Sequence, residues 1–248
     1  MTASPDASGE GLTGRAADPL RYGAGNRARF ESPELIRSML PSGARVLDVG
    51  CGVGAVTAMA NEGKNNTVIC LEPDRARAQA AMARGLTVQR GALDEAFVAE
   101  HGRFDAIVFG DVLEHLADPG AALELAGSAL TPGGVIIASV PNVAHWTVRL
   151  SLLAGRFDYE DSGIMDATHL RWFTRASLRR LLAQQGLEIS DLRYAAGKWL
   201  PAYRSYPWRL LPGRSRPALI VALLHLFPTL FACQFVVAAR VAAPGAVR

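Results

Sequence analysis

The sequence contains little cysteine, and its three cysteines form no recognisable pattern. Cys51, Cys70 and Cys233 are odd in number, lie far apart and include no C-x-x-C pair, so we expect neither a disulfide framework nor a zinc cluster. Charged residues are also few, at 20% of the chain, whereas half of the residues are hydrophobic. This composition excludes a chain that is disordered over most of its length. We therefore expect a globular protein in a reducing compartment.

The excess of positive charge is small and local. The chain has 26 lysines and arginines against 23 acidic residues, which is too mild a surplus to predict nucleic-acid binding. Residues 140–216 contain 12 of those basic residues and 6 of the acidic ones, and the rest of the chain contains 14 and 17. The positive charge therefore belongs to one stretch of the sequence, and we expect no nucleic-acid partner.

The first residues lack the features of an export signal. No basic segment leads into an apolar one over residues 1–21, so the sequence predicts a disordered tail there and a cytoplasmic protein. We assign residues 22–248 to a single catalytic domain, with a helical insertion at about 197–230.

One long uncharged segment, residues 217–239, is long enough to cross a bilayer. Pro228 would interrupt a membrane helix, and His225 and Gln234 would place polar groups in hydrocarbon. The sequence therefore predicts a helix over about 218–227 and a strand over about 230–241. Residues 207–227 combine a tryptophan, arginines and an apolar stretch, which favours peripheral contact with the inner face of an anionic membrane.

Short apolar segments alternate with segments of helical spacing from Arg45 onward. The apolar segments predict strands, which is typical of a doubly wound α/β fold with a mostly parallel sheet. Residues 186–196 and the segment near 230–241 would add a final strand pair and make the sheet seven-stranded. An earlier helix should begin with Ser32 as its N-cap, contain Pro33, and end near Leu40. The predicted parallel strands cover residues 45–49, 67–72, 86–90, 104–110 and 134–140.

A glycine turn, Asp48-Val49-Gly50-Cys51-Gly52-Val53-Gly54, follows the first strand and leads into a helix from Val53 to about Asn61. Glycines let the backbone approach a ligand closely, and both dinucleotides and S-adenosylmethionine use such turns. Glu72 ends the second strand, where an acid holds the two ribose hydroxyls of an adenosine. Asp48 would repel a pyrophosphate but would attract a cationic amino-acid group. The turn therefore favours S-adenosylmethionine.

Four segments occur in a characteristic order: VLDVGCGVG, LEPD, FDAIVFGDVLEHLADP and LTPGGVIIASVPN. From Val46 to about Leu187 the sequence resembles the class I S-adenosylmethionine-dependent methyltransferases. Many of these carry an acid directly after the third strand, where this chain has Ala92 and Leu93 followed by Asp94. Backbone amides of Ala92 and Leu93 would then contact the adenine, and Asp94 would either assist them or cap the next helix. The resemblance implies a cofactor site made of Asp48, Gly50, Cys51, Gly52, Gly54, Glu72, Pro73, Ala92, Leu93 and Asp111.

The segment from Asp111 to His115 follows the fourth strand and permits three interpretations. These residues shape the pocket wall around the methionine part of the cofactor, or His115 is a general base. In the third interpretation, two carboxylates and an imidazole at D-x-x-E-H spacing hold a divalent cation. That spacing is similar to the E-x-x-E-H cluster of ubiquinone-pathway O-methyltransferases, although the first acid is shorter. Our assignment contains no metal.

Residues 155–173 form a polar and aromatic tract that is too long for a simple connection. GRFDY followed by D-x-THLRWFT resembles bacterial methyltransferases linked with surface-polysaccharide and glycolipid pathways. Its aromatic side chains suit a binding cleft, and His169 is our leading candidate for the base, ahead of His115 and His145. Alternatively, His169 caps or braces the helix that begins near Thr174. The arginines that would hold an anionic acceptor are Arg149, Arg156 and Arg171.

The sequence therefore predicts methyl transfer from S-adenosylmethionine to an acceptor, chiefly an oxygen of a small molecule or a saccharide, glycolipids included. Catalysis would need alignment of the acceptor, the methyl carbon and the sulfur. Three alternatives stay open at this point. They are metal-assisted O-methylation of a quinol-like acceptor, a nicotinamide-dependent oxidoreductase, and a non-catalytic protein that binds S-adenosylmethionine.

Overall fold

A central seven-stranded sheet organises the protein, whose computed structural model describes residue 20 and residues 28–242. The strand order is β3-β2-β1-β4-β5-β7-β6, with the first five strands parallel and β7 antiparallel to both β5 and β6. This arrangement confirms the predicted doubly wound, mostly parallel sheet. The strands are β1 (Arg45–Val49), β2 (Thr67–Leu71), β3 (Thr87–Gln89), β4 (Phe104–Gly110), β5 (Leu130–Pro141), β6 (Leu187–Ala195) and β7 (Gln234–Val241). The tail predicted over residues 1–21 lies outside the described residues, apart from residue 20.

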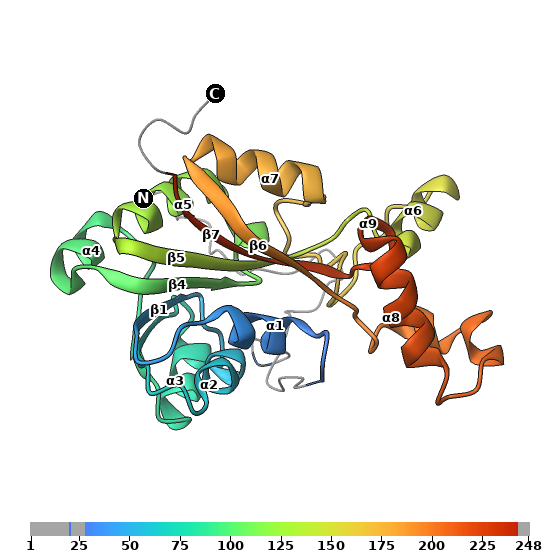
Figure 1. Ribbon diagram of the computed structural model, residues 1–248, viewed down its shortest axis with the longest axis horizontal. Coiled ribbons are helices and arrows are strands. Elements are labelled where there is room, and N and C mark those ends of the chain that lie inside the picture. The colour runs from blue at the N-terminus through green and yellow to red at the C-terminus, as the bar shows by residue number, and fades with distance from the viewer. Residues whose placement is uncertain (1–19, 21–27, 243–248) are drawn as a thin grey trace, which may run out of the picture.

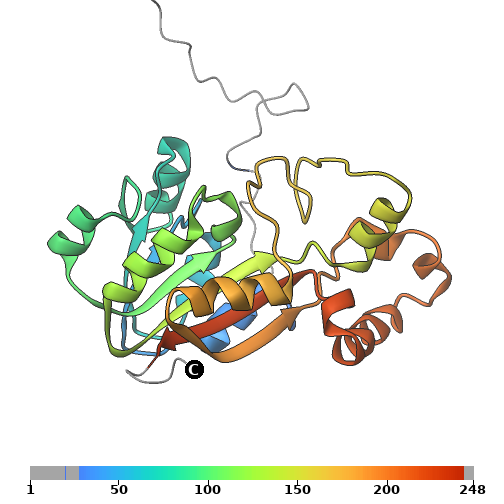
Figure 2. The same cartoon turned by 90° about the horizontal axis from the view of Figure 1, so that it is seen from above.

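Helices cover both faces of the sheet, as Figure 1 shows, with α1, α2 and α3 on one face and α4, α5 and α7 on the other. The remaining helices lie beyond one end of the sheet, as Figures 1 and 2 show. The α-helices are α1 (Ser32–Met39), α2 (Ala55–Asn61), α3 (Arg75–Ala83), α4 (Glu95–His101), α5 (Pro119–Ser128), α6 (Trp146–Leu153), α7 (Arg175–Gln184), α8 (Arg216–Leu226) and α9 (Pro228–Phe231). Three 3₁₀ helices complete the set: η1 (Leu113–His115), η2 (Pro201–Arg204) and η3 (Trp208–Leu210).

The middle strands form the core because their side chains are apolar toward both helical layers. In β4, Phe104, Ala106, Ile107 and Phe109 are fully buried, as are Ile136 and Ile137 of β5. Burying strands on both faces is what a parallel sheet between two helical layers requires. The core therefore fixes the positions at which β1, β4 and β5 end, and the loops after them share one edge of the sheet.

Local structure departs from the sequence predictions at three places. The N-cap of α1 is Glu31 rather than Ser32, and no side chain caps this helix, so Pro33 within its first turn is its clearest starting signal. Helix α2 begins at Ala55 rather than Val53, because Gly54 adopts a left-handed conformation as its N-cap. The last strand begins at Gln234 rather than near residue 230, because Pro228–Phe231 form the short helix α9.

The connection between β6 and β7 contains η2, η3, α8 and α9. Helix α8 has 11 residues, and within the described part of the chain no helix is long and apolar enough to cross a membrane. The uncharged segment at 217–239 is therefore divided between a helix, a turn of helix and a strand, as its proline and polar residues predicted.

Candidate functional site

The glycine turn after β1 is a tight loop with three left-handed glycines. Gly50, Gly52 and Gly54 have φ angles of 71°, 58° and 76°, a region that L-residues with a side chain rarely adopt. A Cβ on Gly50 would lie 2.8 Å from the side chain of Val112, and one on Gly54 would lie 2.3 Å from Leu86. A Cβ on Gly52 would meet no atom within 4 Å. The backbone at Gly52 therefore borders open space.

Glu72 connects the end of β2 to this loop. One of its carboxylate oxygens accepts a hydrogen bond from the Gly52 amide at 2.8 Å, and the other accepts one from the Asp74 amide at 2.9 Å. The residue is buried, and a carboxylate oxygen accepts more than one hydrogen bond. Glu72 therefore braces the glycine loop and keeps acceptor capacity for two hydroxyl groups of a ligand.

Asp48 and Cys51 lie at the two ends of the loop's first turn. The Asp48 carboxylate is buried and accepts a hydrogen bond from the Thr57 hydroxyl at 2.6 Å. Burial raises the pKa of Asp48 from 3.8 to about 7, against the opposing effect of that hydrogen bond. The contact with Cys70, together with burial, raises the pKa of the Cys51 thiol, so Cys51 is a neutral thiol rather than a nucleophile. A cationic group bound beside Asp48 would stabilise the ionised form of its carboxyl.

The structure places the other predicted cofactor residues along the same edge. Pro73 lies between Glu72 and the cap of α3, and Ala92 and Leu93 follow β3. Asp94 is the N-cap of α4, because its side chain accepts a hydrogen bond from the Phe97 amide at 2.7 Å. Of the two roles weighed for Asp94, the helix cap is therefore the one observed.

Asp111 is held by residues from two other strands. It has a φ of 56°, and its carboxylate accepts hydrogen bonds from the Ser139 hydroxyl and the Gln234 amide, each at 2.8 Å. Burial raises the pKa of Asp111. Because Ser139 and Gln234 fix the Asp111 carboxylate, the left-handed turn after β4 is set by β5 and β7, and it directs the following residues toward the loop.

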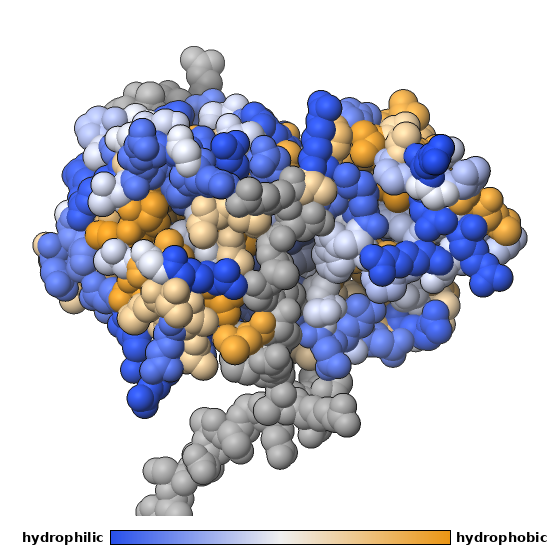
Figure 3. Space-filling model, turned by 90° about the horizontal axis from the view of Figure 1, so that it is seen from below, coloured by the Kyte–Doolittle hydropathy of each residue, from blue (hydrophilic) through white to orange (hydrophobic). Residues whose placement is uncertain are grey.

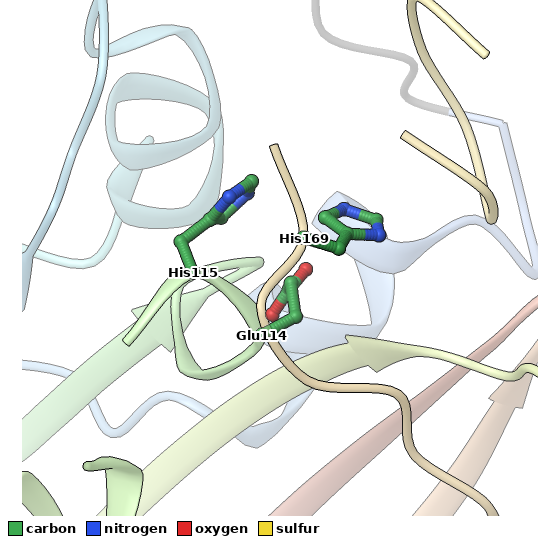
Figure 4. Close-up of side chains that lie close together, drawn as sticks. All are labelled: Glu114, His115 and His169. Atoms are coloured by element: carbon green, nitrogen blue, oxygen red, sulfur yellow. The ribbon is translucent and has the colours of Figure 1, made fainter. Parts of the chain in front are cut away.

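Three side chains meet beside this turn: Glu114, His115 and His169 (Figure 4). Each offers one ligand or proton-accepting atom, and these atoms all lie within 4.8 Å of one another. The two imidazole rings contact edge to face, with ring centroids 4.9 Å apart. Glu114 and His115 belong to η1, whereas His169 comes from the tract before α7.

Backbone hydrogen bonds bring the two segments together. The amides of Leu170 and Arg171 both donate to the Glu114 carbonyl, at 2.8 and 3.0 Å. Asp166 is buried, and its carboxylate accepts hydrogen bonds from the Thr168 amide and hydroxyl. This turn positions His169 over η1. Asp166 is thus a positioning residue that sequence reasoning missed, because its only signal was a place in the D-x-T-H segment.

The same segments also orient the two imidazoles. His115 Nδ1 lies 3.1 Å from the Thr168 carbonyl, and His169 Nδ1 lies 3.2 Å from the Ile164 carbonyl. A carbonyl only accepts, so Nδ1 is the donor in each neutral ring and Nε2 carries the lone pair. Nε2 is therefore the unprotonated nitrogen of each neutral ring.

Glu114 is the most unusual member of this cluster. Its side chain is 1% exposed, and neither carboxylate oxygen has a hydrogen-bond partner among the described residues. Burial, with the Asp111 and Asp166 carboxylates nearby, raises the pKa of Glu114 well above its usual value. A buried carboxyl group without a partner is costly. It must be protonated, or be satisfied by a cation or a donor group that enters the site.

Other residues predicted to act in chemistry have structural partners. Burial lowers the pKa of His145 to about 3, and its ring contacts the Thr147 and Tyr203 hydroxyls, so His145 is a core residue. Thr174 itself caps α7, which excludes that capping role for His169. Arg149 and Arg171 donate to the backbone carbonyls of Ala144 and Ala117.

The aromatic side chains of residues 155–173 divide into a cluster of three and one buried residue. Phe157, Tyr159 and Trp172 contact one another, with ring centroids between 5.6 and 6.2 Å apart. Phe157 and Tyr159 are exposed, whereas Phe173 is buried and pairs with Asn142 near the end of β5. Phe157, Tyr159 and Trp172 therefore form one aromatic cluster, and Phe173 anchors the tract to the sheet.

Comparisons with known proteins show what this chain is similar to. A family described as "Methyltransferase domain" matches residues 24–192. A ubiquinone biosynthesis O-methyltransferase of Xylella fastidiosa strain 9a5c is 31% identical over 175 residues, which is 68% of this chain and 67% of that protein. The protein of the same name from Xanthomonas axonopodis is 30% identical over 61% of this chain. The match spans 66% of that relative, slightly less than two thirds of its length.

Solved structures share the fold at lower identity. A structure from Thermotoga maritima, described as a possible histamine N-methyltransferase, has a TM-score of 0.56 and 16% identity, covering 84% of this chain and 86% of its own. An S-adenosylmethionine-dependent methyltransferase from Mesorhizobium loti has a TM-score of 0.54 and 20% identity, covering 84% and 96%.

Proposed function

Because this chain belongs to the class I S-adenosylmethionine-dependent methyltransferases, we propose that it methylates an oxygen atom of a small molecule or a saccharide, glycolipids included. The family match covers residues 24–192, and its relatives include O-methyltransferases. The cofactor of this family is S-adenosylmethionine. Membership favours methyl transfer over the nicotinamide-dependent and non-catalytic alternatives.

In this proposal the glycine loop holds the cofactor. Glu72 accepts hydrogen bonds from the ribose hydroxyls, because its carboxylate is buried at the loop and already oriented by two backbone amides. Asp48 faces the cationic amino-acid group, whose charge stabilises the ionised carboxylate. Gly52 leaves the space that the ligand needs. These roles support the assignment of the cofactor residues.

The paired imidazoles carry the proposal of an oxygen acceptor. A hydroxyl group is a weak nucleophile until a base removes its proton. His169 is buried, with Nδ1 held by the Ile164 carbonyl and Nε2 as the basic nitrogen. His115 offers the same nitrogen on the adjoining turn. We assign His169 as the general base and His115 as the neighbouring polar group that orients the acceptor.

The reaction balances with these residues alone. The acceptor oxygen forms a bond to the methyl carbon as the carbon–sulfur bond breaks, and the electron pair of that bond stays on the sulfur. His169 Nε2 takes the hydroxyl proton and later releases it to water. In this proposal the cluster of Phe157, Tyr159 and Trp172 covers the bound acceptor and keeps water away from the reacting oxygen.

A direct experiment names the acceptor class. Purified protein is incubated with methyl-labelled S-adenosylmethionine and a bacterial extract, and lipid, glycan, small-molecule, protein and RNA fractions are separated. Glu72→Ala provides the blank. Label in small-molecule, glycan or glycolipid fractions, as an ether stable to base, is the expected result. Label in protein or RNA, or as a methylamine, would overturn the assignment.

Glu114 favours a second candidate, which is cation-assisted O-methylation. Its carboxylate has no hydrogen-bond partner in the described part of the chain, and Glu114, His115 and His169 each offer one ligand atom within 4.8 Å of the others. Such a set fits a divalent cation such as Zn²⁺ or Mn²⁺, because carboxylates and imidazoles are ordinary ligands of these ions. Asp111 does not join them, since Ser139 and Gln234 occupy its carboxylate. A bound cation would lower the pKa of an acceptor hydroxyl.

Metal binding distinguishes the two candidates. Cation assistance predicts that the wild-type protein binds one Zn²⁺ or Mn²⁺ in calorimetry. It also predicts that Glu114→Gln, which keeps the size and shape of the side chain, abolishes this binding. Glu124→Gln, at an exposed position on α5, is the matched control. If the wild-type protein binds neither ion and turnover survives chelators, this candidate is excluded and His169 acts alone.

A further inference from the structure

Beyond the carboxyl edge of the sheet, α6 and residues 197–231 form one structural unit, which we call the lobe. Trp146 at the start of α6 donates to the Tyr203 hydroxyl at 3.3 Å. The Trp208 ring lies 4.9 Å from Tyr203, 6.1 Å from Trp146 and 6.5 Å from Phe231. Figures 1 and 2 show α6, α8 and α9 together at this end of the molecule. The aromatic cluster therefore holds the lobe as a unit.

The lobe is strongly cationic, although the chain as a whole is not. It contains six basic residues and no aspartate or glutamate, whereas the rest of the chain contains 20 basic residues and all 23 acidic ones. Four of the six belong to exposed residues, Arg149 among them, and Lys198 and Arg216 are of intermediate exposure. The basic residues are Arg149, Lys198, Arg204, Arg209, Arg214 and Arg216.

Exposed apolar side chains also concentrate on the lobe. Among the described residues, 15 large hydrophobic side chains are exposed, and nine of them belong to these 43 positions. Leu153 is 84% exposed, Tyr206 73% and Leu226 70%. The lobe's exposed apolar residues are Leu150, Leu152, Leu153, Trp199, Tyr206, Leu210, Leu219, Leu226 and Phe227.

Helix α8 shows why this exposure is unusual. Its 11 residues include only two with polar side chains, Arg216 and His225. Ile220 and Leu224 are buried against the protein, whereas Leu219 and Leu226 face outward. A helix that is apolar on all sides ordinarily lies inside a protein or against lipid. At this end of the molecule, Figure 3 shows apolar patches alternating with hydrophilic ones.

We propose that the lobe docks the protein onto the surface of a bilayer that contains anionic phospholipids. Arginines and a lysine attract the phosphates of anionic headgroups, leucines enter the boundary between headgroups and acyl chains, and tryptophan and tyrosine favour that interface. The phosphates of a nucleic acid would bind the arginines, but they would leave the nine exposed apolar side chains in water. The combination therefore selects lipid as the occupant, and no part of this argument depends on the identity of the methyl acceptor.

The lobe is joined to the site, so docking would place the acceptor pocket near the lipid surface. Asn142, at the end of β5, donates through its side chain to the carbonyls of Thr229 and Ala232. The Val143 amide donates to Phe173, four residues after His169. Asn142 and Val143 therefore connect the lobe and the tract that carries the proposed base.

Vesicle sedimentation of the full chain tests the proposal. Vesicles of phosphatidylglycerol and phosphatidylcholine should bind the protein in low salt, and pure phosphatidylcholine should bind it far less. Each basic residue near an anionic surface contributes about fivefold to partitioning, so Arg204→Gln with Arg209→Gln should weaken binding roughly 25-fold. The matched control pair on α7, Arg179→Gln with Arg180→Gln, should change binding less than twofold. Absence of binding to the anionic vesicles, or equal losses in both pairs, would overturn the proposal.

A second pair of variants separates lipid from other polyanions. Leu153→Ser with Leu226→Ser should weaken vesicle binding several-fold, whereas the exposed pair Met82→Ser with Val241→Ser should not. Brominated phosphatidylcholine mixed into the anionic vesicles should quench the tryptophan fluorescence, since three of the four tryptophans lie in the lobe. Equal affinity of wild-type protein and the leucine pair for single-stranded DNA, without quenching by vesicles, would assign the lobe to nucleic acid instead. Cofactor binding in every variant reports correct folding.

Discussion

The glycine loop and the histidine cluster occupy neighbouring places on one edge of the sheet, but they are assembled over different distances in the chain. Glu72 contacts Gly52 across 20 residues, whereas His115 contacts Thr168 across 53 and Asp111 contacts Gln234 across 123. The geometry of the loop depends on backbone conformations that glycines allow. The geometry of the histidine cluster depends on side chains that other segments of the chain orient. A short motif can therefore specify the first, but only the folded chain can complete the second.

The largest effect is expected in the histidine cluster. His169→Ala should lower kcat by about 10² to 10⁴, because a general base contributes that much, and should leave the dissociation constant of S-adenosylmethionine unchanged. Added imidazole should restore part of the rate. His101→Ala, on α4 and away from both regions, is the control. An unchanged kcat would remove His169 from the reaction and leave His115 as the candidate base.

In the loop, Glu72→Ala should weaken S-adenosylmethionine binding at least 100-fold. The substitution removes the acceptors for the Gly52 and Asp74 amides, and hydrogen bonds to charged groups contribute about 1.5–3 kcal/mol each. Calorimetric titration measures the change, with Glu95→Ala, an exposed residue at the start of α4, as the control. A loss smaller than tenfold would mean that the glycines hold the cofactor without this acid.

Gln234→Leu tests the long-range support of the acceptor region. The change removes the two hydrogen bonds that the Gln234 side chain donates to the Asp111 carboxylate, so the free energy of unfolding should fall by about 2 kcal/mol. Urea denaturation checks this value, and Gln184→Leu, exposed on α7, should change it little. The rate of methyl transfer by the Gln234→Leu protein should also fall, because the turn before η1 loses its hydrogen bonds to β7. Full activity in a stable Gln234→Leu protein would show that β7 does not set this turn.

The smallest expected effect is the pH dependence of the loop. With a pKa of about 7, Asp48 must lose its proton before it attracts a cationic ligand, so S-adenosylmethionine affinity should rise roughly tenfold from pH 6 to pH 8. Asp48→Asn should bind weakly and without this slope. Parallel titrations of both proteins isolate the Asp48 contribution from that of other groups.

The ligand-free protein should show the opposite trend in stability. The Asp48 carboxyl titrates near 3.8 in the unfolded chain and near 7 in the folded one. Its contribution to the free energy of unfolding is therefore complete below pH 4 and is lost as the pH rises to 7. Thermal unfolding of the wild-type protein and Asp48→Asn across this range measures the difference. Parallel curves for the two proteins would show that Asp48 is ionised without ligand.

Much of the fold was predictable because its signals are local. The alternation of apolar and helical segments gave the seven strands, with boundary errors where left-handed Gly54 and Pro228 changed an element's start. Asp94 was recognisable as a cap from its position before a helix. The roles of Ser139, Asp166 and Gln234 were not predictable, since each holds a residue that belongs to another segment.

The sequence by itself determined the doubly wound fold, the glycine loop and its acids, and the membership of the methyltransferase family. These features depend on backbone preferences and residue order within single β-α units, which a linear pattern records. Only the tertiary structure decided that the rings of His115 and His169 contact each other and that Glu114 is buried beside them with no hydrogen-bond partner among the described residues. It also decided that the basic residues of the lobe share that unit with nine exposed apolar side chains. Those properties come from packing between distant segments, because burial and contact are defined by the neighbours that folding supplies.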